Sequence, residues 1–396
     1  MTKKERILLF LLASINFTHI MDFMIVMPLG NYLMPLFKIN PHQFSLIVSS
    51  YSISAGTMSF LAAFFVDRFD RKKVLLFAYS GFIIGTFACG FAPNYEFLVA
   101  ARIVAGTFGG LIGAQGLSIV ADTFEFERRG RAMSSLMAAF SFASAIGVPT
   151  GLFLSKHFGW HTPFIVIGFM GLLIIPLVMI FVPKMTAHIQ HSSERPNLFN
   201  VITNIVKDGN QQIGLLFMIL LMMGHFSIIP FIAQYMEFNV GFTKDHVILM
   251  YFIGGVASMI TAPIIGRMAD KYGKLRVFTV FALLSVVPIF LITNMPHVHF
   301  ALALFVSAFF FIFAGGRIIP AQAIITSVVK PQQRGGFMNI NSSMQQFSTG
   351  LASIAAGFII QKKISGELIN YNVVGYIGIA LTLFCILLAR KVKSVS

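Results

Sequence analysis

Long apolar segments, separated by short polar loops, make up most of this 396-residue chain. Each segment has close to the roughly 20 apolar residues that a helix needs to cross the hydrocarbon core of a bilayer. In lipid a segment must satisfy its own backbone hydrogen bonds, and apolar stretches this long do so as α-helices. The sequence therefore predicts an all-α integral membrane protein with twelve transmembrane helices, at residues 7–36, 43–66, 74–92, 97–122, 130–156, 161–182, 211–236, 245–268, 275–294, 298–328, 335–361 and 371–390.

The composition excludes an ordinary soluble protein. Hydrophobic residues make up 57% of the chain and charged residues 11%, whereas soluble domains carry about 25% charged residues. Both cysteines, Cys89 and Cys385, lie inside apolar segments, so we expect neither a disulfide framework nor a thiolate metal site. They are most simply explained as lipid-facing or packed small residues.

The net charge of +15 is explained by topology. Lys and Arg residues are concentrated at the two termini and in the alternate loops that begin near 68, 128, 184, 267 and 330. The loops on the opposite side hold few of them, namely Lys38, Lys156, Lys244, Lys362 and Lys363. Because basic loops stay in the cytoplasm, this asymmetry places both termini there. The basic residues do not form a single face, so we expect no nucleic-acid partner.

A charged turn occurs twice, at residues 63–73 and 266–276, and each copy connects one apolar segment to the next. A signature that recurs at corresponding points of two halves indicates an internal repeat. Two further pairs of matching segments lie at corresponding points: 113–115 with 320–322, and 129–133 with 334–338.

The repeat divides the chain into two six-helix halves, residues 1–182 and 211–396, joined by a cytoplasmic linker at 183–210. The linker is the longest polar stretch, and it can end in a short surface helix. His188 and His191 lie in it without a third ligand nearby. A solvated loop therefore explains them better than a metal site, and we expect no bound metal.

The motifs resemble those of the major facilitator superfamily over essentially the whole chain. The turn at 266–276 is similar to the family's Gly-x-x-x-Asp-Arg/Lys-x-Gly-Arg/Lys loop, whereas the turn at 63–73 departs from it with Ala63 and Asp70 where glycines are usual. Residues 102–106 resemble the Arg-x-x-x-Gly element of the fourth span, and 147–151 the span-five motif associated with antiporters. Asp22 begins a segment, 22–28, similar to the first-span acidic motif of drug exporters.

Within the superfamily the chain most resembles twelve-span drug:proton antiporters and sugar-efflux proteins. The resemblance implies a secondary active transporter that works by alternating access and exports a small organic or amphipathic compound in exchange for protons. It implies no cofactor, because the proton gradient supplies the energy, and we expect a monomer in the cell membrane whose partners are the substrate, protons and the bilayer. Proton-coupled nutrient uptake is the alternative.

A membrane receptor or an enzyme is a weaker alternative. The sequence has no phosphate-binding Gly-Lys-Ser/Thr loop and no His-Glu-x-x-His motif, and these would be expected of an ATP-driven pump or a metalloprotease. We therefore expect that the protein is not an enzyme.

Asp22 is the one acidic residue near the middle of an apolar segment. A buried ionisable group is costly in a membrane and indicates function. Burial favours the neutral acid and a nearby cation favours the carboxylate, a competition that suits a proton carrier. Arg102 is the expected partner, and His19, one turn before Asp22, is a candidate relay. A structural ion pair without proton turnover, and a packing role for His19, stay open.

The two charged turns are candidates for cytoplasmic gates. The family resemblance implies a latch between the halves, formed by Asp67, Arg68, Arg71, Asp270, Lys271 and Lys274. Asp67 and Asp270 can also cap neighbouring helix N-termini. A positive-inside anchor without a switching role is the alternative.

Small residues and a proline mark the fifth span as a candidate hinge. Gly147 and Gly151 leave one helix face bare, and Pro149 between them can kink the helix. Gly106 and Gly110 form a similar pair in the fourth span. Ordinary small-residue packing explains both pairs equally well.

Polar residues inside the spans are candidates for a central substrate cavity at the interface of the repeats. Arg317 has no intramembrane acid in its own half and suits an anionic or carbonyl-rich substrate; alternatively it snorkels to the surface. The 21 Met and 44 Phe residues suit a broad amphipathic substrate range. The further cavity candidates are Asn16, Gln115, His225, Gln234, Gln322, Asn341, Gln345 and Gln346.

Overall fold

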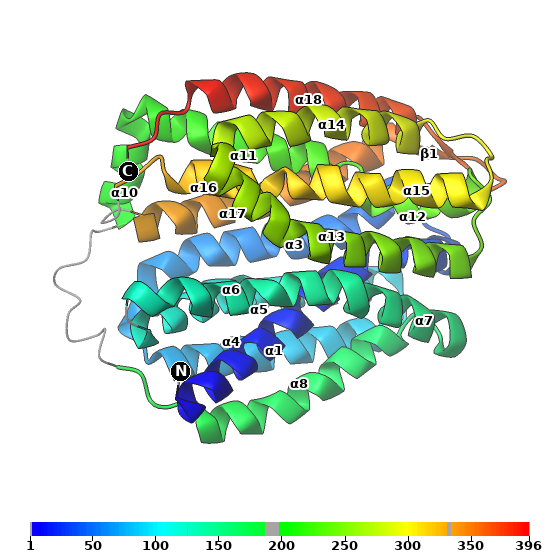
Figure 1. The fold of residues 1–396 in the computed structure, drawn as a ribbon. Helices are drawn as coiled ribbons and strands as arrows, with labels where there is room; N and C mark the ends of the chain where they lie inside the picture. The colour runs from blue at the N-terminus through cyan, green and yellow to red at the C-terminus, as the bar shows by residue number, and fades with distance from the viewer. Residues whose placement is uncertain (1, 125, 187–197, 331–333, 396) are drawn as a thin grey trace.

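The computed structural model describes residues 2–124, 126–186, 198–330 and 334–395. The chain forms a bundle of long helices that run roughly side by side, with both termini and α10 at one end and a small hairpin at the other (Figure 1). The linker histidines His188 and His191 lie outside the described residues.

The first group of helices contains the expected first six spans. Its elements are α1 (Lys3–Ile25), α2 (Gly30–Leu36), α3 (Pro41–Phe65), the 3-10 turn η1 (Val66–Arg68), α4 (Arg71–Gly90), α5 (Tyr95–Thr123), α6 (Phe126–Phe142), the π-helical segment η2 (Ala143–Gly147), α7 (Val148–Phe158) and α8 (Thr162–Phe181). We refer to α1–α8 as the N-terminal half.

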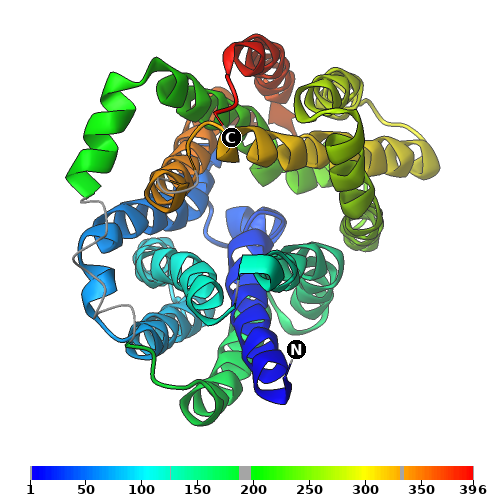
Figure 2. The same cartoon turned by 60° about the vertical axis from the view of Figure 1, so that its left-hand side comes forward.

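The second group follows the short helix α10 (Leu198–Lys207), which forms where the sequence predicts a surface helix. Its elements are α11 (Gly209–Phe226), α12 (Ile229–Phe238), α13 (Lys244–Tyr272), α14 (Lys274–Thr293), α15 (Phe300–Phe310), the π-helical segment η4 (Phe311–Gly315), α16 (Ile318–Thr326), α17 (Arg334–Ile359), the strands β1 (Gln361–Lys362) and β2 (Leu368–Ile369), and α18 (Tyr371–Lys391). Elements α11–α18 are the C-terminal half. The helices of each half lie together, and α17 of the C-terminal half packs against α3 of the N-terminal half (Figure 2).

Eleven helical stretches in the described part of the chain are long and apolar enough to cross a membrane. The expected eleventh span forms as the 26-residue helix α17 but is not among them. Its sequence is interrupted by polar residues, including Asn339, Asn341, Gln345 and Gln346. The all-helical membrane architecture is therefore confirmed, and the number of twelve spans stays a prediction.

The first span of each half is broken rather than continuous. The expected span 7–36 ends its first helix at Ile25 and restarts at Gly30, because Pro28 disfavours helical backbone in the residue before it. The expected span 211–236 is interrupted at Ser227 and Ile228, and Pro230 then lies in the first turn of α12. Paired interruptions in corresponding spans are typical of a carrier's binding region.

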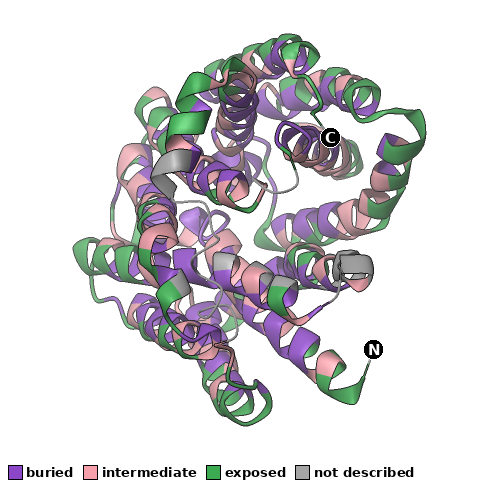
Figure 3. Cartoon of the chain, turned by 90° about the vertical axis from the view of Figure 1, so that its left-hand side faces the viewer, coloured by how far each residue is buried: buried purple, intermediate pink, exposed green. Residues whose placement is uncertain are grey.

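The outer surface of the bundle is apolar. On α8, Phe169, Leu173 and Ile180 are all largely exposed, and the exposed residues lie around the perimeter of the bundle when it is seen from the end that carries the termini (Figure 3). A surface this apolar fits lipid rather than water.

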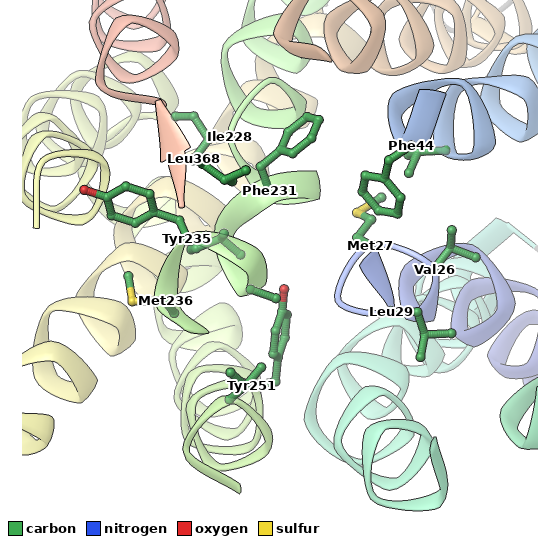
Figure 4. Packing of buried hydrophobic residues seen from close by; sticks show 14 of the residues in the cluster. Val26, Met27, Leu29, Phe44, Ile228, Phe231, Tyr235, Met236, Tyr251 and Leu368 are labelled. Atoms are coloured by element: carbon green, nitrogen blue, oxygen red, sulfur yellow. The ribbon is translucent and has the colours of Figure 1, made fainter. Parts of the chain in front are cut away.

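The two halves share a hydrophobic core at the end away from the termini. There Met27, Leu29 and Phe44 of the N-terminal half belong to one buried cluster with Phe231 and Met236 of the C-terminal half, and the two sets face each other (Figure 4). The rings of Phe44 and Phe231 are 5.7 Å apart. At the end with the termini the two halves have different buried clusters, and Ala63 and Phe64 of α3 pack against the cluster of the C-terminal half.

Candidate functional site

A buried ion pair joins α1 to α5 inside the N-terminal half. Arg102 donates from Nη1 to Asp22 Oδ2 over 2.6 Å and weakly to the Asp22 carbonyl over 3.5 Å. Both side chains have 0% exposure. The expected pairing of Asp22 with Arg102 is thus present in the structure. Because no water reaches either charge, each depends on the other for its compensation.

An aromatic side chain covers one face of the Arg102 guanidinium. The Tyr51 ring, from α3, lies 4.2 Å from the guanidinium carbon of Arg102, which is within cation–π distance. His19 packs beside Tyr51 and Phe82, with ring centroids 6.1 Å and 5.7 Å away. Its ring therefore contacts the residues around the ion pair, whereas the direct partner of Asp22 is Arg102.

Several polar atoms around the pair have no hydrogen-bond partner. Asp22 Oδ1 is unbonded, and Thr86, which lies beside the carboxylate, has an unbonded hydroxyl. Arg102 Nε and Nη2 and the Tyr51 hydroxyl are also unbonded. Asp22 can therefore carry a proton on its free oxygen, and a neighbouring hydroxyl group can accept a hydrogen bond from it.

The sequence did not identify Tyr51, Thr86 or Cys89 as part of this site. Cys89 is buried and lies next to Arg102, so it is a packed residue and does not face lipid. A single Tyr, Thr or Cys in an apolar span is ordinary, and only its distance from a buried charge distinguishes it. Thr86 and Tyr51 could have been selected as polar residues in spans, as Asn16 and Gln115 were.

The candidate cavity residues of the N-terminal half lie apart from the ion pair's immediate shell. Asn16 donates to the Leu136 carbonyl on α6 over 3.1 Å, so it bridges two helices. Gln115 is buried on α5, and its Oε1 has no partner.

The candidates of the C-terminal half fall into two places. Gln322 on α16 donates to Gln345 on α17 over 3.1 Å, and Asn341 on α17 is fully buried with both side-chain polar atoms unbonded. Gln346 lies against Gly56 of α3 in the other half. Gln234 lies elsewhere, on α12, where it donates to the Met27 carbonyl over 3.2 Å. Of the candidate cavity residues in this half, the structure thus joins Gln322 and Gln345 by a hydrogen bond, but it does not bring all of them to one place.

Arg317 and His225 lie inside the C-terminal half. Arg317 has 0% exposure and donates to Ser285 and Thr382. The alternative that it snorkels to the surface is therefore wrong, because its guanidinium is enclosed by α14 and α18. His225 is buried on α11, where its ring stacks on Phe310 with centroids 6.4 Å apart.

The two charged turns differ in structure. In the first, Arg71 Nε pairs with Asp122 Oδ2 over 3.1 Å, which ties α4 to α5, while Arg68 is exposed. In the second, Asp270, Lys271 and Lys274 are all exposed. In the described part of the chain no ion pair links the two turns, so their gating role stays a prediction.

Helix capping at the two turns involves a residue that the sequence did not single out as a cap. Asp70 caps α4, because its Oδ1 accepts from the backbone of Lys72 over 3.0 Å and also holds Met185 over 3.0 Å. The side chain of Asp67 lies outside the described side chains. Helix α14 begins after Gly273 with no side-chain cap, so the predicted cap by Asp270 is wrong.

The candidate hinge in the fifth span lies where a π-helical segment ends. Gly147 is the last residue of η2, and Pro149 lies in the first turn of α7. A β-carbon at Gly147 would meet Met21 at 3.2 Å, and one at Gly151 would meet Ile25 at 2.6 Å. The small residues therefore let this span pack closely against α1.

Polar contacts between the halves supplement the shared core. Asn31 on α2 hydrogen-bonds Glu237 on α12 and donates to the Ala233 carbonyl over 3.3 Å. Lys156 on α7 forms a salt bridge with Asp245 on α13, with Nζ 2.6 Å from both carboxylate oxygens. The sequence did not identify these residues, because the partners are about 90 or more positions apart.

A polar cavity of about 310 Å³ lies beside the β1–β2 hairpin, lined by Tyr235, Asn239, Lys363, Glu367 and neighbouring residues. Lys363 hydrogen-bonds Glu367 over 2.7 Å, and this bond holds the pKa of Glu367 below its ordinary value. The hairpin that it adjoins lies at the end of the bundle opposite the termini (Figure 1).

Comparison with known proteins agrees with this architecture. The model of the Major Facilitator Superfamily matches residues 12–211 and 214–395. The chain belongs to this superfamily of membrane transporters. It is 24% identical over 353 residues to the uncharacterised MFS-type transporter YceJ of Bacillus subtilis, covering 89% of both chains. It is also 24% identical to Multidrug resistance protein 2 of Bacillus subtilis, covering 96% of this chain and 95% of the relative.

The fold is shared with solved transporters. The crystal structure of a D-xylose-proton symporter superposes with a TM-score of 0.75 at 18% identity, and the match covers 96% of each chain.

Proposed function

We propose that this protein is a proton-coupled exporter of small organic compounds that works by alternating access, with Asp22 as the site that takes up and releases the proton. The single observation that carries this proposal is the fully buried pair of Asp22 and Arg102. A carboxylate enclosed in a membrane protein is retained for a function rather than for stability alone.

The bonding pattern supports reversible protonation. When Asp22 takes a proton, Arg102 loses its ionic partner but keeps the Tyr51 ring, 4.2 Å away. Asp22 Oδ1 is the oxygen that Arg102 does not bind, so it can take the proton, and the Thr86 hydroxyl lies beside the carboxyl group as a hydrogen-bond partner. The ionised and the protonated carboxyl group thus both have interaction partners. The proton can therefore be taken up and released.

The direction of transport rests on the relatives. Multidrug resistance protein 2 matches almost the whole chain, which supports export and a place in the bacterial cell membrane. The fold is equally that of a D-xylose-proton symporter, and for this reason proton-coupled uptake is the second candidate. In both cases the halves rock about a central site, and the charged turns at 67–71 and 270–274 gate its cytoplasmic side.

The test is transport by the purified protein in liposomes loaded with a pH-sensitive dye. Addition of a substrate from a panel of organic cations, carboxylates and sugars will move protons against the substrate in export, or with it in uptake. Asp22→Asn will abolish proton movement and gradient-driven accumulation. Removal of one partner from a buried ion pair costs about 3–5 kcal/mol, so folding must be verified by chromatography and thermal unfolding.

Glu96→Gln is the matched control, because it makes the same acid-to-amide change at an exposed residue of α5. Accumulation that persists in folded Asp22→Asn would overturn the assignment of the proton site.

A further inference from the structure

Arg317 is a buried cation without a compensating anion. It lies between η4 and α16 with 0% exposure, and Nη1 donates to Ser285 Oγ over 3.0 Å and to Thr382 Oγ1 over 2.6 Å. Both hydroxyl groups already donate to backbone carbonyls, of Ala282 and Gly378. They are therefore neutral acceptors, and they leave the positive charge uncompensated.

The unused donors of Arg317 lie along one edge of the guanidinium. Nε and Nη2 have no hydrogen-bond partner, and these two nitrogens form the edge that binds a carboxylate or phosphate through two parallel bonds. No described carboxylate forms a salt bridge with Arg317, whereas the other buried arginine, Arg102, has Asp22. An arginine stays protonated in a protein, so this edge requires an anion that the described chain does not supply.

A second unpartnered group lies in the same half. His225 is 8% exposed, is close enough to Arg317 to feel its charge, and has an unbonded Nδ1. Its ring contacts Phe310 by stacking and Phe226 edge-on, with the latter centroids 5.2 Å apart. His225, which feels the charge of Arg317, is thus itself part of an aromatic wall.

The aromatic wall continues to the interface between the halves. Phe226 lies 6.0 Å from Phe23 of α1, and Phe23 lies 5.6 Å from Tyr51, the ring that covers Arg102. A row of rings therefore connects the surroundings of Arg317 with those of the proton-binding pair, and an apolar body bound along this row would lie between the two halves.

The backbone before Arg317 is irregular in a way that is typical of functional sites. The π-helical segment η4 ends two residues before it, and the hydroxyl of Ser258 donates to the Phe311 carbonyl over 3.2 Å. Single π-turns inside helices occur frequently at functional sites. Here the irregular turn sets the position of Arg317 relative to α14 and α18.

We propose that Arg317 and His225 form an anion subsite that binds the carboxylate of an aromatic or apolar monocarboxylate, whose body lies along Phe226 and Phe23. This inference rests on the proposed transport function and names its substrate class. The carboxylate binds the Nε and Nη2 edge of Arg317, and the rings supply apolar contact. An inorganic anion such as chloride could supply the same charge, so the experiment compares the two sources.

The experiment measures ligand-dependent thermal stabilisation of the purified full-length protein in detergent. Benzoate, its neutral analogue benzamide, and chloride are titrated at constant ionic strength with methanesulfonate, which has no carboxylate, as the balancing anion. Binding to the folded state raises the unfolding temperature as ligand concentration passes its dissociation constant. We expect stabilisation by benzoate, none by benzamide, and a weaker effect of chloride.

The variants assign the effect to the subsite. Arg317→Gln is expected to weaken benzoate binding by about tenfold or more, because it removes two charge-assisted bonds. His225→Phe keeps the ring against Phe310 and removes the free nitrogen, so it reports on the subsite if Arg317→Gln does not fold. Equal stabilisation by chloride and benzoate, no stabilisation by benzoate, or unchanged benzoate affinity in both variants would overturn the proposal.

The binding experiment needs no pH gradient and no turnover, so it is independent of the transport test. Stabilisation by benzoate and gradient-driven transport are separate readouts, and the subsite and the proton site can each fail alone.

Discussion

The aromatic cover of Arg102 has a role distinct from that of the ion pair. With Asp22 ionised, Arg102 has a carboxylate 2.6 Å away, and the Tyr51 ring is a secondary partner. With Asp22 protonated, the ring becomes the main compensation for the charge. If Asp22 is the proton site, as proposed, Tyr51 acts as a positioning residue that stabilises the protonated state more than the ionised one.

Tyr51→Leu should therefore make Asp22 harder to protonate. A desolvated cation–π contact is worth about 2 kcal/mol, and a difference of about 1.4 kcal/mol corresponds to one pH unit. We expect the pH of half-maximal transport to move by about one unit toward acid in liposomes of the kind used for Asp22→Asn. Tyr51→Phe keeps the ring and should leave the pH profile unchanged.

A loss of packing alone would lower the unfolding temperature of Tyr51→Leu without moving its pH profile. Such a result would contradict the positioning role.

The residues of the proposed proton site differ in how far the sequence reveals them. Asp22 and Arg102 stand out because a charge inside an apolar segment is rare and costly. Tyr51 and Thr86 do not, because they are unremarkable in a membrane helix until the fold places them next to the charge. The inter-half bond from Asn31 to Glu237 also depends on packing that no local pattern encodes.

At the scale of elements, close helix contacts depend on glycines, and the sequence does not show which glycines lie at such contacts. Gly255 on α13 packs against the backbone of η2 in the other half: an added β-carbon would lie 2.6 Å from the Ser144 carbonyl oxygen and the Ala145 Cα. Gly266, on the same helix, would meet nothing within 4 Å.

Gly255→Ala and Gly266→Ala should therefore have opposite effects on stability. The first forces two backbones apart and is expected to cost about 1–3 kcal/mol. The second fills open space in a helix and is expected to be neutral or to stabilise by up to about 1 kcal/mol. Thermal unfolding of the two purified variants measures the difference, and equal unfolding temperatures would contradict the close contact of α13 with η2.

The broken and π-helical segments are the elements that the sequence predicts least well. Hydropathy averages over a window, so it predicted continuous spans at 7–36 and 211–236. The interruptions depend on single residues, Pro28 and Pro230, and on side chains that satisfy the freed backbone groups. The π-helical segments η2 and η4 leave no comparable mark in the sequence.

At the scale of the molecule, the internal repeat and the hydropathy were enough to predict an all-helical membrane bundle, because in lipid few other folds satisfy the backbone. They could not show how the halves meet. The shared cluster of Met27, Phe44 and Phe231 and the bridge from Lys156 to Asp245 lie at the end opposite the termini, so this end is closed.

Alternating access requires the closed end to open, and this leads to a prediction for the inter-half bridge. With Lys156 and Asp245 both replaced by cysteine, a short thiol crosslinker that contains a reducible disulfide should join the halves and abolish transport in liposomes. The native cysteines, Cys89 and Cys385, are buried and should not react. Reduction of the crosslinker should restore transport, because only the relative motion of the halves is blocked.

Lys363 and Glu367 provide the matched control. They form a salt bridge of 2.7 Å, similar to the 2.6 Å of the bridge between Lys156 and Asp245, but both lie around the β1–β2 hairpin of the C-terminal half. Crosslinking the cysteine pair at 363 and 367 leaves the halves free to move and should not change the transport rate. If the crosslinked pair at 156 and 245 transported at the same rate as this control, the closed end could not be a gate that opens in the cycle, and the halves would have to exchange substrate by a motion that preserves this contact.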